Sequence, residues 1–112
     1  MAENNENVKP RRASYTIVKH VPRIEFDLTN NDYCIANAIY TLSNEPENKF
    51  PGWYYGKIET LGRLFDLSRS TAYGSVQKLI DKKLVVKDDE TGFLKTTQLW
   101  WSEFESFKLA KK

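Results

Sequence analysis

The chain contains very little of what catalytic and metal centres are usually built from. Its 112 residues include one cysteine, Cys34, and one histidine, His20. A lone cysteine excludes an internal disulfide and a cysteine-based zinc site, and the apolar residues around Cys34 indicate that it fills the core. His20 has no cysteine or carboxylate at a spacing typical of catalysis, and the five glycines form no phosphate-binding loop. We therefore expect no enzymatic activity, no cofactor and no metal site.

Long apolar segments are also missing. No run approaches the roughly 18 apolar residues needed to cross a bilayer, and the start, MAENNENVKPRR, lacks the apolar core of a secretion signal. These absences predict a cytoplasmic protein with no membrane partner. With 40% hydrophobic and 29% charged residues, the composition is that of one globular domain. Residues 1–13 are polar and basic, so we expect a flexible arm over 1–13 and the domain over 14–112.

The net charge of +2 is small, but the charges are segregated along the chain. Residues 8–23 carry basic side chains and no acid, residues 24–48 carry five acids and no base, and residues 49–83 are positive again. Such segregation produces local fields that the total hides. A basic surface for a phosphate-bearing partner is one interpretation, and an ordinary solvated surface is the other.

The first half of the domain contains a predicted strand and a predicted helix. The stretch SYTIVKHV, residues 14–21, is β-branched and partly alternating, which is typical of a short strand, and residues 24–28 continue as an extended lead-in with one apolar side. Thr29 is a good N-cap residue, and Asp32 three positions later suits the positive end of a helix. The helix that they begin has apolar residues at helical spacing: Ile35, Ala38, Ile39 and Leu42.

A loop and two further helices follow. The stretch SNEPENKFPGW, residues 43–53, contains two prolines and a glycine and is predicted to be a loop. A second, shorter helix is marked by Ile58, Leu61, Leu64 and Phe65. After a break at residues 66–67, Ser68 can cap a third helix. The buried stripe of this third helix consists of Ala72, Val76, Leu79 and Ile80.

The last part of the chain predicts a hairpin and a final helix. Two apolar β-type runs flank residues 88–92, DDETG, where Gly92 can supply the positive backbone dihedral of a turn. The acids of this turn could hold a hard cation, but a solvated acidic turn is the favoured interpretation. Trp100, Phe104 and Phe107 lie at positions i, i+4 and i+7 of an amphipathic helix, where they either cover the sheet or form the seam of a homodimer.

The order of these elements and one segment resemble a known family. The order strand, helix, helix, tight turn, helix, hairpin is that of a winged helix-turn-helix. The segment IETLGRLFDLSRSTAYGSVQKLIDKKLVV is similar to the DNA-binding domain of phage and plasmid replication initiators and related regulators. In this segment Leu61-Gly62 lets two helices cross closely, Ser70-Thr71 opens the recognition helix, and Asp66 stands where the turn usually has glycine. The resemblance implies an α+β, mainly α fold with a three-helix core, a β-hairpin wing and a C-terminal helix.

The same resemblance implies a function. It points to a protein that binds double-stranded DNA and regulates transcription or replication, encoded by a phage or other mobile element and working in the cytoplasm of a bacterial or phage-infected cell. A homodimer would suit this role, because paired recognition helices bind paired half-sites. The alternative is a winged helix that docks a protein partner and binds no DNA. The acidic stretch 24–48, the acidic turn and the aromatic tail favour that alternative.

One flank of the third helix carries only small or hydrogen-bonding side chains. At about 100° per residue the apolar stripe faces the core, so Ser70, Gly74 and Gln77 point away from it, with Tyr73 beside them. A helix in the major groove needs short side chains and hydrogen-bonding groups, and glutamine can bind adenine through two contacts. Glycine costs about 1 kcal/mol relative to alanine inside a helix, which indicates that a partner needs the space at Gly74. We therefore expect these four residues to contact bases.

Charged and hydroxyl side chains surround this flank and are candidates for phosphate contacts, which supply most of the affinity for DNA. They are Ser68, Arg69, Thr71 and Lys78 on the third helix and its cap, Lys57 and Arg63 on the second helix, and Arg11 and Arg12 in the arm. Each charge could instead serve only solubility. The rings of Trp53, Tyr54 and Tyr55 could stack on bases, but packing against the core is the favoured interpretation.

Overall fold

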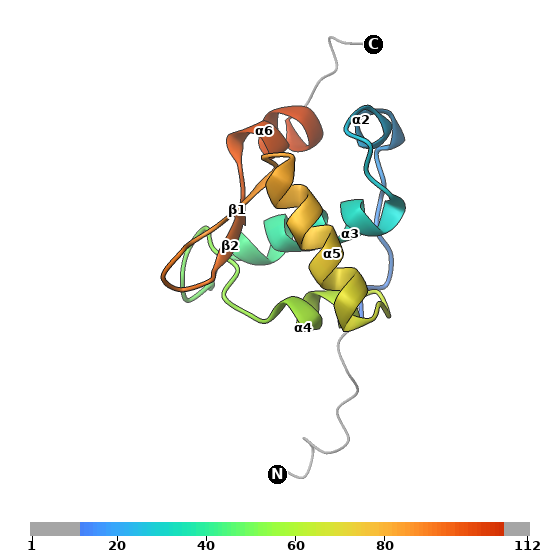
Figure 1. Ribbon diagram of the computed structural model, residues 1–112. Helices are drawn as coiled ribbons and strands as arrows, with labels where there is room; N and C mark the ends of the chain where they lie inside the picture. Colours follow the sequence, from blue (N-terminus) through green and yellow to red (C-terminus); the bar gives the residue numbers. More distant parts are fainter. Residues whose placement is uncertain (1–11, 107–112) are drawn as a thin grey trace.

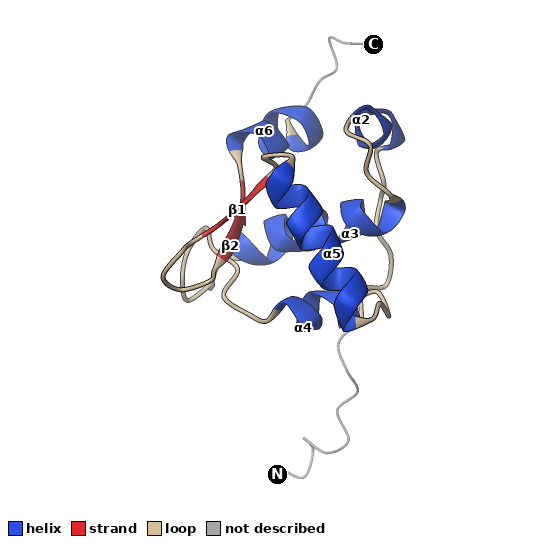
Figure 2. Ribbon diagram, viewed as in Figure 1, coloured by secondary structure: helices blue, strands red, loops and turns tan. Residues whose placement is uncertain are grey.

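The computed structural model describes residues 12–106 and has a mainly helical α+β fold (Figure 1). The elements in chain order are α2 (His20–Glu25), α3 (Asn30–Ser43), α4 (Ile58–Arg63), α5 (Arg69–Asp81), β1 (Val85–Lys87), β2 (Leu94–Thr96), α6 (Gln98–Trp100) and the π-helical turn η1 (Trp101–Glu105). Figure 2 shows the two strands as a small hairpin at one side of the helices. Arg11 and Phe107 lie outside the described residues. Within residues 12–106, no helix combines the length and the apolar character that a membrane crossing requires.

Helix α3 is the central element, and it begins with the predicted capping pattern. Thr29 Oγ1 accepts a hydrogen bond from the Asp32 amide at 3.0 Å, and Asp32 Oδ2 accepts one from the Thr29 amide at 2.9 Å. The two bonds form a complete capping box. The helix packs against α4, α5 and β2, and Ile35 and Ile39 on its inner side are completely buried. The helix predicted to start at Thr29 is therefore confirmed.

The connection between α4 and α5 is tight because of a glycine and a left-handed aspartate. A Cβ on Gly62 would lie 2.9 Å from the Cβ of Ala72, so the two helices approach this closely only with glycine there. Asp66 adopts φ +59°, and the following amide donates to the Gly62 carbonyl at 2.9 Å to end α4. Ser68 Oγ accepts from the Thr71 amide at 3.1 Å and caps α5. Both predicted helices, their close crossing and the Ser68 cap are confirmed.

The predicted hairpin is also confirmed. Strands β1 and β2 pair antiparallel, and Leu94 of β2 forms a further bridge to Tyr54 in the loop before α4. In the turn, Asp88 Oδ2 accepts from the Thr91 amide at 2.8 Å, and Gly92 adopts φ +79°. The bridge to Tyr54 ties the long loop to the hairpin, so these two segments form one side of the molecule.

The strand predicted over residues 14–21 is wrong. Residues 12–19 have no regular secondary structure, and α2 begins at His20. A β-branched, alternating segment becomes a strand only when another strand pairs with it. In the described chain the only paired segments are β1, β2 and the bridge at Tyr54, so this stretch has no such neighbour.

The extended lead-in predicted over residues 24–28 is wrong as well. Ile24 belongs to α2 and is exposed, and Asp27 at φ +60° turns the chain after that helix. Leu28 is buried in the core, and Phe26 is partly buried against it. Arg23 Nη1 donates to the Leu28 carbonyl at 2.6 Å and holds the turn against α2.

Trp100 and Phe104 belong to the core of the chain itself. Their side chains are 0% and 1% exposed, and their rings stack with centroids 4.2 Å apart. Both rings contact Tyr33 of α3, and Phe104 also contacts Phe26. The alternative in which Trp100 and Phe104 form a dimer seam is therefore wrong, because α3 and the segment before it already cover them. Phe107, the third residue assigned to that seam, lies outside the described residues.

Candidate nucleic-acid interface

The outer face of α5 is uncovered where the sequence predicts base contacts. Ser70, Gly74 and Gln77 are exposed, and Tyr73 keeps 44% of its surface accessible. A Cβ placed on Gly74 would meet no heavy atom within 4 Å. In Figure 1, α5 crosses the front of the molecule with no element over it. The four predicted residues, spaced i, i+3, i+4 and i+7, therefore share one open face.

The opposite side of α5 anchors the helix in the core. Ala72, Val76 and Leu79 are buried as predicted, and Ile80 is partly buried. Ser75 is also buried, although the sequence analysis assigns it no role. The hydroxyl of Ser75 donates to a side chain of α3, so a polar contact adds to the apolar packing that holds α5.

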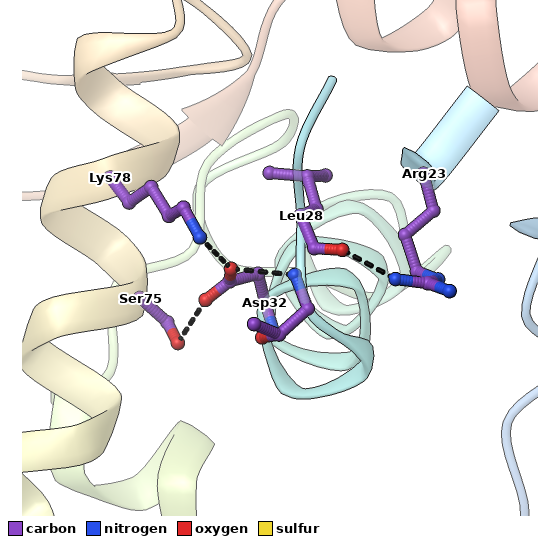
Figure 3. A network of polar contacts seen from close by, with 6 residues as sticks. Arg23, Leu28, Asp32, Ser75 and Lys78 are labelled. Carbon is purple, nitrogen blue, oxygen red and sulfur yellow. Dashed lines mark hydrogen bonds and ion pairs between the residues drawn. The ribbon is translucent and has the colours of Figure 1, made fainter. Parts of the chain in front are cut away.

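A buried carboxylate on α3 makes this polar contact (Figure 3). Asp32 is 5% exposed and accepts from Ser75 Oγ at 2.7 Å and from Lys78 Nζ at 2.7 Å. Burial by itself raises the pKa of Asp32, but the hydrogen bonds from Lys78, Ser75 and Thr29 outweigh burial and hold the pKa below its ordinary value. Asp32 is therefore ionised at neutral pH. By binding two residues three positions apart on α5, it fixes the rotation of α5 about its own axis.

The predicted phosphate contact from Lys78 needs correction. Lys78 Nζ is paired with Asp32, and the Lys78 side chain is only 34% exposed. An ammonium that is neutralised inside the chain is not available to a phosphate without breaking this ion pair. The sequence alone does not reveal the partner, because Asp32 lies 46 positions away.

Two arginines with exposed guanidinium groups lie where α4 ends and α5 begins. Arg69 Nε lies 3.6 Å from Glu59 Oε1, and Arg63 Nη1 lies 3.4 Å from Glu59 Oε2. The Arg69 guanidinium also lies 5.2 Å from the centre of the Tyr73 ring. Exposed ion pairs of this kind contribute little to stability. Neither pair therefore holds its arginine firmly, and the predicted phosphate contacts of Arg63 and Arg69 stay predictions.

The other residues predicted to contact phosphate differ in whether their side chains already have a partner within the described chain. Lys57 is exposed at the start of α4, and among residues 12–106 no carboxylate lies within 4 Å of its ammonium. Ser68 Oγ and Thr71 Oγ1 form a hydrogen bond of 2.9 Å with each other beside the amino end of α5. Ser68 already caps the helix. A ligand that contacts these two hydroxyls would therefore also lie at the amino end of α5, where the helix dipole is positive.

Arg12 connects the beginning of the described chain to the same end of the molecule. Arg12 Nη1 donates to the Arg63 carbonyl at 3.0 Å, and Nη2 lies 3.9 Å from Asp66 Oδ1. Residue 12 is thus bonded to the turn between α4 and α5 rather than free. Arg11, the other arginine assigned to the arm, lies outside the described residues.

An open groove separates the second half of α5 from β1, and the sequence analysis assigns no role to its cations. Gln77 lines one side, and Lys83, Val86, Lys87 and the acidic Asp89 line the other. Gln77 Nε2 donates to Asp81 Oδ1 at 3.0 Å, so its amide is held in a defined orientation. The sequence could have indicated both lysines, because Lys83 comes shortly before β1 and Lys87 is the last residue of that strand.

One acid of the hairpin turn, Asp88, stabilises the turn itself. Asp88 Oδ2 accepts from the Thr91 amide at 2.8 Å, the Thr91 hydroxyl at 2.9 Å and the Glu90 amide at 3.1 Å. These bonds, above all the one from the Thr91 amide, lower the pKa of Asp88. Asp89 and Glu90 are exposed at the tip. Within the described residues, no three His, Cys, Asp or Glu side chains gather in a way that could hold a metal ion.

The three aromatic residues before α4 pack against the hairpin side of the molecule. Tyr54 is buried, its hydroxyl donates to a backbone carbonyl at 2.7 Å, and burial raises its pKa to about 12. Lys95 Nζ lies 4.6 Å from the centre of the Trp53 ring. Tyr55 contacts the Phe93 ring but stays half exposed. The packing interpretation is confirmed for Tyr54.

No protein-family model, curated protein or solved structure matches this chain. Its function is therefore inferred from the residues of the α5 face and their surroundings.

Proposed function

We propose that this protein binds double-stranded DNA as a winged helix-turn-helix, with α4 and α5 as the helix-turn-helix and the β1–β2 hairpin as the wing. Helix α5 enters the major groove and its open face contacts base edges. Through this binding the protein regulates transcription or replication of the DNA that carries its site, in a bacterial or phage-infected cell.

The open face of α5 is the observation that carries the proposal. An exposed glycine inside a helix destabilises it by about 1 kcal/mol relative to alanine. No contact in the described chain requires glycine at position 74, because a Cβ there would meet nothing within 4 Å. Close approach by a second molecule does require it. Ser70 and Gln77 on the same face carry side-chain groups that can donate hydrogen bonds to base edges and accept hydrogen bonds from them.

Cations lie at both ends of this face. Arg63 and Arg69 stand at its amino end, and Lys83 and Lys87 border the groove beside Gln77 at the other end. The predicted base-contacting residues thus lie between two pairs of cations, although Asp89 also lines the groove beside Lys83 and Lys87. This arrangement suits DNA, because phosphate contacts then set the position of the helix and base contacts set the preference for sequence.

Selection from a random duplex library, followed by affinity measurements at several salt concentrations, tests the proposal. We expect enrichment of a defined sequence and a steep fall of affinity with salt. Each phosphate contact should steepen the plot of log affinity against log salt concentration by about 0.9. Arg69→Ala should reduce that slope by about one and leave the preferred sequence unchanged. Gln77→Ala should change the preferred sequence instead. Lys49→Ala, in the loop before α4, serves as the control and should do neither.

A second candidate function is docking of a protein partner without DNA, and the hairpin side favours it. Phe50, Tyr55 and Phe93 form an aromatic cluster with ring centroids 4.9–6.2 Å apart. Asp89 and Glu90 are exposed at the tip of the same hairpin. Exposed rings beside acids suit a basic protein surface better than phosphate. Failure to enrich any duplex, with no effect of Arg69→Ala on binding, would contradict DNA binding and favour this function.

A further inference from the structure

We propose that a cavity beside the loop that joins α3 to α4, residues 44–57, binds a lysine or arginine side chain of a partner protein. The cavity opens to solvent and has a volume of about 290 Å³. This volume is at the lower limit of the roughly 300–1,000 Å³ that pockets for whole small molecules occupy, so it suits one long side chain. In Figure 1 the loop lies beside the hairpin, to which it is bridged at Tyr54.

The side of the cavity nearest the core is apolar and aromatic. Tyr54 and Leu64 line it from the core, and both are buried. Leu42, at the end of α3, is partly buried, and Trp53 and Tyr55 add two more rings to the lining. Such walls favour methylene groups, and the faces of the rings also attract cations.

The charged side chains that line the cavity are both acidic. Glu45 and Glu47 contribute to the lining, whereas no described lysine, arginine or histidine does. Both glutamates occupy exposed positions of the loop. The cavity is therefore apolar toward the core and negative toward solvent.

A lysine or arginine side chain matches both parts of the cavity. Such a side chain has an apolar stem and a cationic head, so the stem can lie against the rings and the head beside the carboxylates. Trp53 already contacts a cation within the chain, because Lys95 Nζ lies 4.6 Å from the centre of its ring. Lys95 is not part of the lining, so the site for the partner's cation is separate from it. A phosphate would be repelled by the two glutamates, so DNA is not the expected occupant.

The loop is held in one shape by hydrogen bonds of its own. Asn48 Nδ2 donates to the carbonyls of Ser43 and Trp53 at 2.7 and 2.9 Å, so it ties the end of α3 to the second half of the loop. Tyr54 exchanges two backbone hydrogen bonds with Leu94 of β2, at 2.6 and 3.0 Å. A cavity with fixed walls loses little conformational freedom on binding, so one side chain can contribute measurable affinity.

This inference goes beyond DNA binding and does not depend on it, because no residue of the open face of α5 lines the cavity. It gives a chemical identity to the partner of the second candidate function. Tyr55 lines the cavity and also belongs to the aromatic cluster with Phe50 and Phe93. A partner segment whose cation occupies the cavity would therefore extend over that cluster.

Selection of random peptides displayed on phage against the full chain, followed by titration of an enriched peptide, tests the proposal. We expect the enriched peptides to share a lysine or arginine. Replacing that residue by glutamine should weaken binding about tenfold, since the change removes a cation–π contact and ion pairs. Glu47→Gln in the protein should weaken binding about threefold. Glu25→Gln is the matched control, because it removes the same charge from an exposed position of α2 and should leave the affinity unchanged.

The indole N–H signals of an isotope-labelled chain show where the peptide binds. The signal of Trp53 should shift during the titration. The signal of Trp101, which is 45% exposed and does not line the cavity, should stay in place. This readout locates the peptide without any substitution in the protein.

Three results would overturn the proposal. The first is enrichment of no peptide, or of peptides that share no cation. The second is an equal affinity of Glu47→Gln and Glu25→Gln for the enriched peptide. The third is a shift of the Trp101 signal with none at Trp53. Glu47→Gln should bind the selected duplex as the wild type does, so failure of the peptide experiment leaves DNA binding standing, and failure of the duplex selection leaves the cavity standing.

Discussion

Replacement of Asp32 by alanine tests how the core holds α5. Asp32 accepts hydrogen bonds from the Thr29 amide, the Ser75 hydroxyl and the Lys78 ammonium. Loss of the bond to Thr29 costs about 0.5–1 kcal/mol, and a buried Ser75 hydroxyl without its acceptor costs about 1–3 kcal/mol. Lys78 adds little, because its side chain is 34% exposed and can turn to water. The free energy of unfolding should therefore fall by about 2–4 kcal/mol, a large share of the 5–15 kcal/mol typical of a domain.

Urea denaturation measures this effect as a lower midpoint with an unchanged slope. Asp81→Ala is the matched control, because it removes an exposed carboxylate from α5 that accepts from Gln77. The control should change the free energy of unfolding by less than about 0.5 kcal/mol. If Asp32→Ala is no more destabilising than Asp81→Ala, the buried contacts do not hold α5 and the reasoning is refuted.

The same contacts predict a dependence on pH. Because the pKa of Asp32 is lower in the folded chain than in the unfolded chain, its stabilising contribution is complete above the unfolded value of about 3.9 and disappears as the pH falls through the folded value. The difference in unfolding free energy between the wild type and Asp32→Asn should therefore shrink below about pH 4. Burial raises the pKa of Glu105, which acts in the opposite direction, but Glu105 is present in both proteins and its effect cancels. A difference that stays constant down to low pH would contradict this.

Three further substitutions test the elements around α5. Gly62→Ala places a Cβ 2.9 Å from that of Ala72, so urea denaturation should show a loss of about 1–3 kcal/mol, and an unchanged midpoint would disprove the close crossing. Asp66→Gly should raise the thermal midpoint, because glycine accepts φ +59° without strain, which is worth about 0.5–1 kcal/mol. Lys78→Met removes the cation beside the buried Asp32 and should lower stability by about 1–2 kcal/mol, after discounting for partial exposure. In DNA-binding titrations Lys78→Met should leave the salt slope unchanged, and a slope reduced by about one would restore its role as a phosphate contact.

The elements with strong local signals could be predicted from the sequence. The capping box at Thr29, the Ser68 cap and the glycine in the hairpin turn each act within a few residues, so the sequence alone contains their cause. The strand over residues 14–21 could not be predicted correctly, because β-branched alternation also suits an extended segment without a partner. Whether a partner strand exists depends on the whole fold.

The candidate site likewise has one part that could be predicted from the sequence and one part that could not. The open face of α5 follows from helical periodicity, which predicts an exposed side with Ser70, Gly74 and Gln77, and all three are exposed. The burial of Ser75 and the pairing of Lys78 depend on Asp32, which lies more than 40 positions away in the sequence. The sequence reveals the local role of Asp32 in capping a helix. It does not reveal the long-range contacts of Asp32 with Ser75 and Lys78.

The affinity of Gly74→Leu for the selected duplex tests the central claim most directly, because leucine fills the space that the claim reserves for DNA. Leucine is a good helix former and would meet no atom of the described chain near its Cβ, so the variant should be more stable by about 0.8 kcal/mol. Thr41→Leu, at an exposed position of α3, is the control and should bind as the wild type does. The account predicts that Gly74→Leu, although more stable, binds the duplex at least about tenfold more weakly, a loss of about 1.4 kcal/mol. A more stable variant with wild-type affinity would show that DNA does not lie against α5.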